Sequence, residues 1–236
     1  MIKLLDLLEN KILVPRRSKE ERDKKFMIIT QKKIQQYIKD GSHGDLWLDS
    51  ISFKKLPDEL TTVGGNLVLN YSELESLNNL QSVGGNLWMV ECKNFKSFGN
   101  LEYIGGNLRA SSAPIKSFDK IKYIGGEVEE FFNRFSLESL GDLEFVGKLN
   151  LNSSKIESLG NLTKAKDLTL SHTPLKSLGN LKEVNNLTLY GSMIESLPPD
   201  LKVKKYINIG RTPLSEKYTE EEIRQMVPGI KGEIKY

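Results

Sequence analysis

Near-identical units repeated along the chain constrain its fold more than any other feature of the sequence. Three consecutive units open at Leu149, Leu168 and Leu187 with a leucine, a polar residue and a second leucine, and each carries further apolar residues seven and ten positions after its start. Extending this frame in both directions gives nine unit starts at intervals of 19–21 residues: Leu46, Leu67, Leu87, Leu108, Val128, Leu149, Leu168, Leu187 and Ile207. A unit this short cannot bury its apolar side chains alone, so the units must stack and share one elongated core.

Each unit has the same internal pattern. The apolar-x-apolar opening, as at Leu67–Leu69, predicts a short strand whose first and third residues face the core. Later apolar positions return to the core from an irregular or short helical segment, and the Gly-Gly-Asn triplets at 64–66, 84–86 and 105–107 predict turns in which glycine supplies a positive φ. Strands stacked at this interval predict a parallel sheet on one face of the solenoid.

A small polar residue follows most unit starts by five positions. We expect its side chain to bond backbone groups where the chain turns inward, and this position explains Cys92 as a structural residue rather than a reactive thiol. The residues at this position are Ser72, Cys92, Asn133, Ser154, Thr173, Ser192 and Thr212.

These strands, polar positions and regular leucines resemble the leucine-rich-repeat family over residues 44–214. The usual asparagine is mostly Ser or Thr here, and the turns that follow Val63 and Val83 are more similar to those of receptor L-domain-like and fungal cell-wall repeat proteins. The short units and both termini also resemble repeat proteins encoded by bacteriophages. The expected fold class is thus an α/β repeat, a leucine-rich-repeat-like solenoid with a parallel β-sheet on one face.

Both ends of the chain predict caps for this solenoid. Ser18 and Glu21 form a capping-box pattern that begins a helix at about 18–40, so residues 1–43 are expected to form an N-terminal helical cap. Thr219 starts a short helix that ends near Val227, and residues 230–236 alternate as an edge strand would. Residues 215–236 are therefore expected to form a C-terminal helix and strand cap.

Composition narrows the possible functions. Residues 1–43 hold eleven Lys or Arg against six Asp or Glu, which leaves the other 193 residues at a net charge of −2, without the basic stripe of a nucleic-acid-binding domain. A single cysteine favours a reducing compartment, Asp6 and Glu9 interrupt the apolar opening residues, and no stretch reaches the ~18 apolar residues of a membrane span. We expect a cytoplasmic protein with no membrane contact.

Residues suited to catalysis are scarce. The two histidines, His43 and His172, are about six units apart, and the Gly-Gly-Asn turns lack the Lys-Ser/Thr of a phosphate-binding loop. The acidic residues at 127–130 have no partner pattern that marks a glycosidase. The sequence therefore predicts a protein that is not an enzyme and has no catalytic, metal-binding or cofactor-binding residues.

The residues one and three positions after each unit start are expected to face outward on the strand face. In the fifth unit we expect a bulge that turns Phe132 outward, because strict alternation would bury Glu130. Aromatic and arginine side chains in this face are typical of interface anchors, although scattered exposure of such residues is also common. The expected partner-binding residues are Trp47, Val68, Trp88, Arg109, Glu129, Phe132 and Tyr190.

The main functional hypothesis is a scaffold, monomeric and non-enzymatic, that binds a host or viral protein on the strand face of its first five units. The first alternative is a structural or assembly protein, such as a virion component or a self-associating rod. The second is a nucleic-acid accessory protein that uses its basic N-terminal helix.

Overall fold

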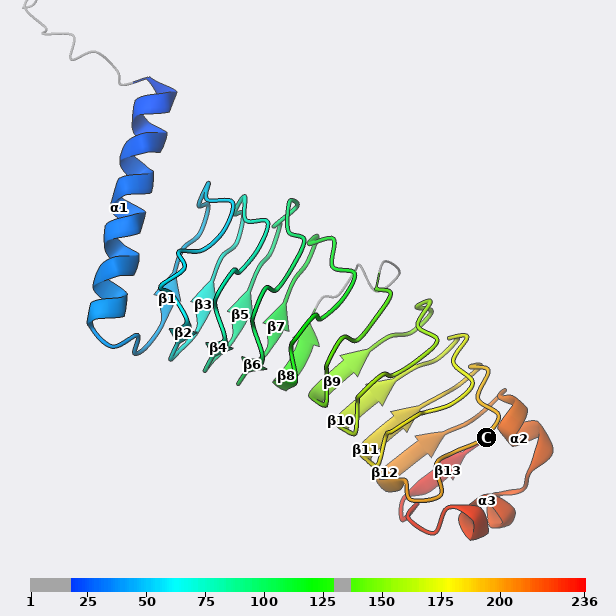
Figure 1. Ribbon diagram of the computed structural model, residues 1–236. Coiled ribbons are helices and arrows are strands. Elements are labelled where there is room, and N and C mark those ends of the chain that lie inside the picture. Colours follow the sequence, from blue (N-terminus) through cyan, green and yellow to red (C-terminus); the bar gives the residue numbers. More distant parts are fainter. Residues whose placement is uncertain (1–17, 130–136) are drawn as a thin grey trace, which may run out of the picture.

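The computed structural model describes residues 18–129 and 137–236, and these form a β-solenoid of about eight turns. Helix α1 (Lys19–Lys39) lies beside the first turn, and helices α2 (Pro213–Lys217) and α3 (Glu220–Met226) lie beside the last (Figure 1). No helix in the described ranges is both long enough and apolar enough to cross a membrane.

Parallel strands run along the whole solenoid. Those that cover the unit starts, followed by β13 at the end, pair in the order β1-β3-β5-β7-β8-β9-β10-β11-β12-β13, while β2, β4 and β6 pair in a second row that joins β8. The strands are β1 (Leu46–Trp47), β2 (Thr62–Val63), β3 (Leu67–Val68), β4 (Ser82–Val83), β5 (Leu87–Trp88), β6 (Tyr103–Ile104), β7 (Leu108–Arg109), β8 (Tyr123–Glu129), β9 (Phe145–Asn150), β10 (Lys164–Thr169), β11 (Glu183–Thr188), β12 (Lys202–Asn208) and β13 (Glu233–Lys235).

The register of these strands confirms the repeat frame. Unit starts pair along the solenoid from Leu46 with Leu67 to Leu187 with Ile207, and Ile207 pairs in turn with Ile234. Between β8 and β9 the register shifts, and the pair recorded beside the unit starts is Glu127 with Lys148. The leucines and isoleucines that follow in each unit are buried in one continuous core. The sequence period therefore predicts which residues are neighbours across the turns.

The strands begin earlier in each unit than the apolar-x-apolar pattern predicts. In the first turns a second two-residue strand precedes each Gly-Gly-Asn triplet, and from β8 to β12 the two merge into single strands of six or seven residues. Between β1 and β12 the described return segments hold no helix. The return is thus irregular rather than helical.

The expectation that the triplet glycines adopt positive φ is wrong. A Cβ built on Gly84, Gly105 or Gly125 would lie 2.1–2.2 Å from the carbonyl oxygen of the corresponding glycine in the preceding turn. Glycine is needed here because two backbones approach closely, and a methyl group has no space between them.

The left-handed conformation occurs elsewhere, four residues after every unit start except Val128, for which the corresponding residue lies outside the described ranges. The chain turns there with φ between 55° and 66°, a region that costs most L-residues about 1 kcal/mol. These residues are Ser50, Tyr71, Glu91, Ser112, Ser153, His172, Gly191 and Arg211.

Asparagines after the glycine pairs link the first turns. The side-chain oxygen of Asn66 accepts hydrogen bonds from the backbone N–H (2.8 Å) and side-chain amide (2.9 Å) of Asn86, and Asn86 accepts one from the backbone N–H of Asn107 (2.7 Å). The series starts at Asp45, whose Oδ1 accepts two hydrogen bonds from Asn66. These bonds satisfy backbone amides between strands, where no partner strand exists.

The polar residues five positions after the unit starts are buried, but their roles differ. The hydroxyl groups of Thr173 and Thr212 donate to the carbonyl oxygens three residues earlier, at 2.8 and 2.6 Å, as expected. The hydroxyl groups of Ser154 and Ser192 have no hydrogen-bond partner within the described residues. Asn133 lies outside those residues.

The two ends confirm the predicted helix starts. Ser18 and Thr219 are the N-caps of α1 and α3, each in a reciprocal capping box with a glutamate. Ile34 of α1 is buried in the core, whereas Phe26 and Ile29 on the N-terminal half of the helix are exposed. Helix α2 was not predicted, although Thr212 followed by proline is a recognised helix-start signal.

Candidate functional site

Five of the expected partner-binding residues lie in one row across neighbouring strands. The register pairs Trp47 of β1 with Val68 of β3, Val68 with Trp88 of β5, Trp88 with Arg109 of β7, and Arg109 with Glu129 of β8. Adjacent strands in a sheet are about 4.8 Å apart, so the row is continuous. We call these five residues the Trp47–Glu129 row.

The two tryptophan rings lean toward each other over the strand between them. Their centroids are 6.1 Å apart at an interplanar angle of 75°, although strands two positions apart are separated by about 9.6 Å. Val68 lies under the rings with only 1% of its surface exposed, so the expectation that it faces solvent is wrong. Trp47 is 50% exposed and remains accessible.

Polar groups border this aromatic pair on both sides. The ammonium group of Lys33 in α1 donates a hydrogen bond to the carbonyl oxygen of Trp47 at 2.6 Å, which fixes the helix beside the first strand. At the other end of the row Arg109 is half-buried, and a carboxylate oxygen of Glu129 accepts a hydrogen bond from the amide of Asn107. The row thus runs from an apolar aromatic surface to a guanidinium and a carboxylate.

Tyr190 does not belong to this row. It lies just after β11, five strand spacings or about 24 Å from β5. Its ring packs edge-on against His172 at 5.6 Å, and the guanidinium of Arg211 lies 5.3 Å from the ring centroid. Phe132, together with the expected bulge at Glu130, lies outside the described residues.

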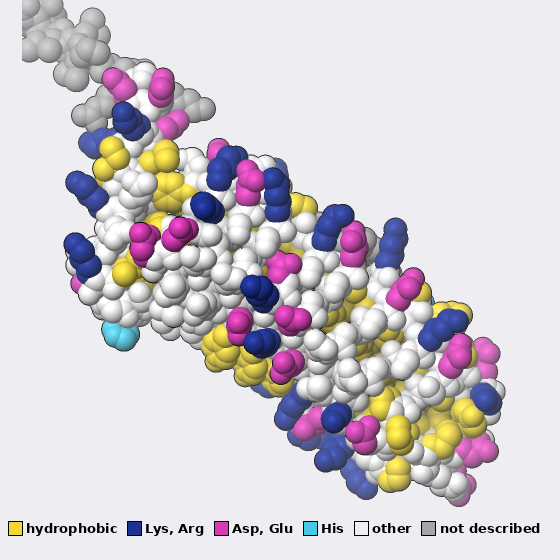
Figure 2. All heavy atoms as spheres, in the orientation of Figure 1, with side chains coloured by type: hydrophobic (Ala, Val, Ile, Leu, Met, Phe, Trp, Pro, Cys, Tyr) yellow, Lys and Arg dark blue, Asp and Glu magenta, His cyan; other side chains and the backbone are white. Residues whose placement is uncertain are grey.

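A stack of three aromatic rings was not predicted from the sequence. Tyr103 and Tyr123 stack at 5.0 Å and 8°, and Tyr123 and Phe145 stack at 4.7 Å and 13°. They stand at the starts of β6, β8 and β9, where Figure 2 shows hydrophobic side chains gathered on the lower edge of the molecule. In the sequence, an aromatic residue recurs four or five positions before three successive unit starts, and this pattern was the signal that could have predicted the stack.

The ring stack is a poor platform for a planar ligand. Each inner face is covered by the next ring, so mainly the edges are free for contacts. An ion pair between Lys122 and Glu102 (2.9 Å) comes from the residues immediately before two of the rings. The stack therefore joins the turns and adds a narrow apolar edge bordered by charge.

Cys92 is the one cysteine of the chain, and it is buried. Burial raises the pKa of its thiol, and the sulfur lies 3.1 Å from the carbonyl oxygen of Leu69 and 3.3 Å from the hydroxyl of Ser72. A thiol with a raised pKa holds little of the nucleophilic thiolate at neutral pH. These contacts agree with the structural role expected for this residue.

Within residues 18–129 and 137–236, no three His, Cys, Asp or Glu side chains are placed to hold a metal ion. Comparison of the sequence with models of known protein families and with curated proteins gave no match.

Proposed function

We propose that the chain is a non-enzymatic scaffold that binds a protein partner through the Trp47–Glu129 row. One observation carries the proposal: Trp47 is half-exposed while its ring is held edge-on against Trp88 above a buried valine. Tryptophan and arginine are the side chains that most often dominate the energy of protein interfaces, and this row presents both.

The packing of the two rings favours binding. A side chain already fixed by its neighbours loses little rotamer freedom in a complex, so less of the interaction free energy is spent on ordering. The polar groups of Lys33, Arg109 and Glu129 around the rings would form the rim that surrounds the apolar centre of many interfaces.

The proposal includes a leucine-rich-repeat type of architecture for residues 44–214, with residues 1–43 and 215–236 as terminal caps. The burial of Ile34 next to the first turn and of Ile223 next to the last supports the two caps. From the resemblance to phage-encoded repeat proteins, the proposal further takes the partner to be a host or viral protein in the cytoplasm.

The test compares capture of partners by three forms of the protein. Proteins retained from a lysate of the native host by the wild type are identified, and the affinity of each is then measured directly with the wild type, Trp47→Ala and Trp47→Ala/Trp88→Ala. Loss of one anchor is expected to weaken binding by about 30-fold, equivalent to ~2 kcal/mol. Met193→Ala is the matched control because Met193 is 49% exposed and lies in the eighth turn.

Two results decide the matter. The tryptophan variants must keep the far-ultraviolet circular dichroism of the wild type, which shows that they still fold. The single variant Trp47→Ala is included because it leaves Trp88 above Val68. Unchanged affinity of the double variant for every directly binding partner would refute the proposal.

Self-assembly is a second candidate, and the exposed apolar surface of α1 favours it. Phe26, Ile28 and Ile29 are 45–53% exposed on the N-terminal half of the helix. Light scattering over a range of concentrations would show a mass that rises with concentration in the wild type and stays monomeric in Ile29→Lys. A wild type that stays monomeric throughout would exclude this candidate.

A further inference from the structure

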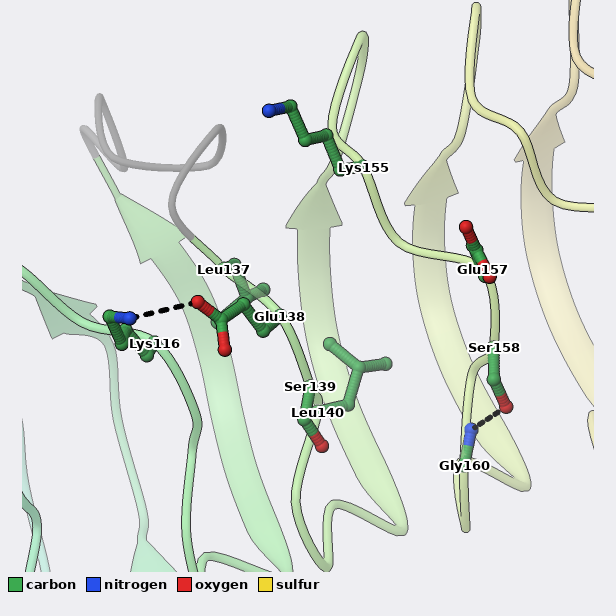
Figure 3. A pocket seen from close by; sticks show the side chains of 9 residues that line it. All are labelled: Lys116, Leu137, Glu138, Ser139, Leu140, Lys155, Glu157, Ser158 and Gly160. Atoms are coloured by element: carbon green, nitrogen blue, oxygen red, sulfur yellow. Dashed lines mark hydrogen bonds and ion pairs between the residues drawn. The ribbon is translucent and has the colours of Figure 1, made fainter.

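A hollow of about 550 Å³ lies on the return side of the solenoid, between the fifth and sixth turns (Figure 3). Lys116 and Glu138 stand on one wall and form an ion pair at 2.9 Å, and Lys155 and Glu157 stand on the other. A charged ligand of either sign would meet as many like charges as opposite ones. This hollow therefore favours no particular ligand, in contrast to the uncovered face of α1 at the N-terminal end.

Helix α1 packs one face against the first turn and leaves the opposite face uncovered by any element that the structure describes. Thr30 and Ile34 are buried, and Tyr37 and Ile38 pack against the core. Figure 1 shows the solenoid on this side of the helix only. The terminal element of a repeat stack normally presents a polar surface to solvent. Large apolar side chains on the opposite face are therefore unusual for a cap.

Side chains three or four positions apart form a stripe along this uncovered face. Ile28 and Ile29 lie at its centre and are 45% and 53% exposed. Glu21 lies toward the start of the helix, and Lys25 and Lys32 lie on either side of the isoleucines. We call these five exposed residues the outer stripe. It has an apolar centre, an acidic residue at its N-terminal end and a lysine at its C-terminal end.

The charges of the whole helix follow the same order. Residues 20–23 hold three acidic residues and one arginine, whereas residues 24–39 hold five lysines and no Asp or Glu. Neither Glu21 nor Lys32 forms an ion pair with any residue that the structure describes. Helix α1 has a turn of the solenoid on one side only, so a partner on its other side would meet charges that are still free to pair.

This order of charges favours a second copy of α1 over other partners. An anionic lipid surface or a nucleic acid would be attracted by the lysines but repelled by the acidic start of the same stripe. A second α1 in antiparallel orientation places its lysines beside the acidic start and its isoleucines beside the apolar centre. Because each copy presents the same patch to the other, the contact has twofold symmetry and closes at two copies.

We propose that two copies of the chain associate through antiparallel packing of their outer stripes, with Glu21 of each copy facing Lys32 of the other. Lys25 then faces Ile28 of the second copy, and the aliphatic part of the lysine covers the isoleucine while its ammonium group reaches solvent. The contact spans about 17 Å of helix, so the association is weak and depends on concentration. This inference rests on the self-assembly candidate described above and not on the Trp47–Glu129 row.

Sedimentation equilibrium of the full chain from about 10 μM to about 1 mM tests the proposal, because this range detects weak association. The mass of the wild type is expected to rise from the monomer value of 26.7 kDa and to level off at twice that value. Trp47→Ala is expected to behave as the wild type does, which separates this result from the test of the strand face.

Charge variants test the antiparallel arrangement. Lys32→Glu places like charges together at both ends of the contact and is expected to raise the dissociation constant of the dimer at least ~10-fold. Glu21→Lys/Lys32→Glu restores both ion pairs and is expected to return the dissociation constant to within about threefold of the wild-type value. Lys155→Glu is the matched control, because Lys155 is also exposed but lies in the sixth turn. A parallel pair of helices would instead place the two Lys32 side chains together, so Lys32→Glu would then have no effect.

Three outcomes would overturn the proposal. A wild type that stays monomeric up to about 1 mM would remove both the self-assembly candidate and this inference, and would leave the strand-face proposal untouched. Equal dimerisation of the wild type and Lys32→Glu, or a mass above that of two copies, would retain self-assembly but refute the antiparallel pair. The third outcome is a double variant that stays monomeric although its far-ultraviolet circular dichroism matches that of the wild type. This spectrum is needed because Glu21 also accepts a hydrogen bond from Ser18 N in the capping box.

Discussion

Replacing Gly84 with alanine is expected to lower the free energy of unfolding by about 2–3 kcal/mol, because backbone atoms of two turns would collide. The new Cβ would lie 2.1 Å from the carbonyl oxygen of Gly64. Neither group can rotate away, so the two turns must separate by about 1.3 Å or more to reach an ordinary contact distance of 3.4 Å.

The magnitude follows from the hydrogen bonds that the separation breaks. Gly84 N donates to the carbonyl oxygen of Val63 at 2.8 Å, and Gly85 N donates to that of Gly65 at 2.9 Å. A separation of this size takes both beyond the 3.2 Å limit of a good bond, at about 1–2 kcal/mol each. Alanine offsets ~0.4–1 kcal/mol of this loss by restricting the unfolded chain.

Urea unfolding followed by tryptophan fluorescence measures the effect, since Trp88 belongs to the same turn as Gly84. Amide hydrogen exchange of β3, β5 and β7 shows whether the loss is local, because stacked repeats can unfold in parts. The matched control is Gly179→Ala, where no atom lies within 4 Å of the new Cβ and only the positive φ of 55° opposes it, at about 1 kcal/mol. Equal losses for the two variants would refute the steric argument.

Three further predictions concern single side chains. Thr212→Val removes a buried hydroxyl that donates to the carbonyl oxygen of Ile209 and caps α2, and should lower the free energy of unfolding by about 1–2 kcal/mol in chemical denaturation. Ser192→Ala should leave that free energy unchanged, since the Ser192 hydroxyl has no partner among the described residues. Cys92 should react with a thiol reagent at least ~100-fold more slowly in the folded than in the unfolded protein, as absorbance of the released product would show. Hydrogen bonds from the lysines on either side lower the pKa of Glu183 in the folded protein. The stabilisation by this carboxylate is therefore fully present above its unfolded pKa of about 4.3 and is lost as the pH falls through the lower folded pKa. The difference in free energy of unfolding between wild type and Glu183→Gln should shrink over that pH window.

Each of these predictions has a clear contrary result. Equal losses for the threonine and serine variants would mean that the threonine hydroxyl contributes no net hydrogen bond. Rapid labelling of native Cys92 would place the thiol at an accessible surface. A constant difference between wild type and Glu183→Gln from pH 6 to acid denaturation would remove the proposed linkage.

The period of the leucines was enough to predict the register of the sheet, because buried apolar side chains leave one way to stack units of equal length. Capping signals at Ser18 and Thr219 likewise predicted the starts of α1 and α3 within a residue. Both kinds of signal depend on neighbours in sequence or on a fixed repeat. For this reason the sequence alone is enough to predict the strand register and the helix starts.

The errors concern features that depend on distances between turns. Glycine at position 84 could serve either a positive φ or a close approach, and the sequence does not distinguish the two. Val68 occupies an outward position but is buried because two larger side chains lean over it. The stack that begins at Tyr103 was missed because the residues before each unit start were interpreted as turns and not as strands.

The asparagine series also gives the solenoid a direction of growth. Asn66, Asn86 and Asn107 each accept a bond from the following turn, whereas Asp45 at the origin has no amide and only accepts. A duplicated turn inserted between two asparagine turns would find both its donor and its acceptor already in place. The same turn added before Asp45 would place an asparagine side-chain oxygen against Asp45, whose carboxylate has no hydrogen to donate in return, so lengthening of this protein by gene duplication is expected inside the stack and not at its first turn.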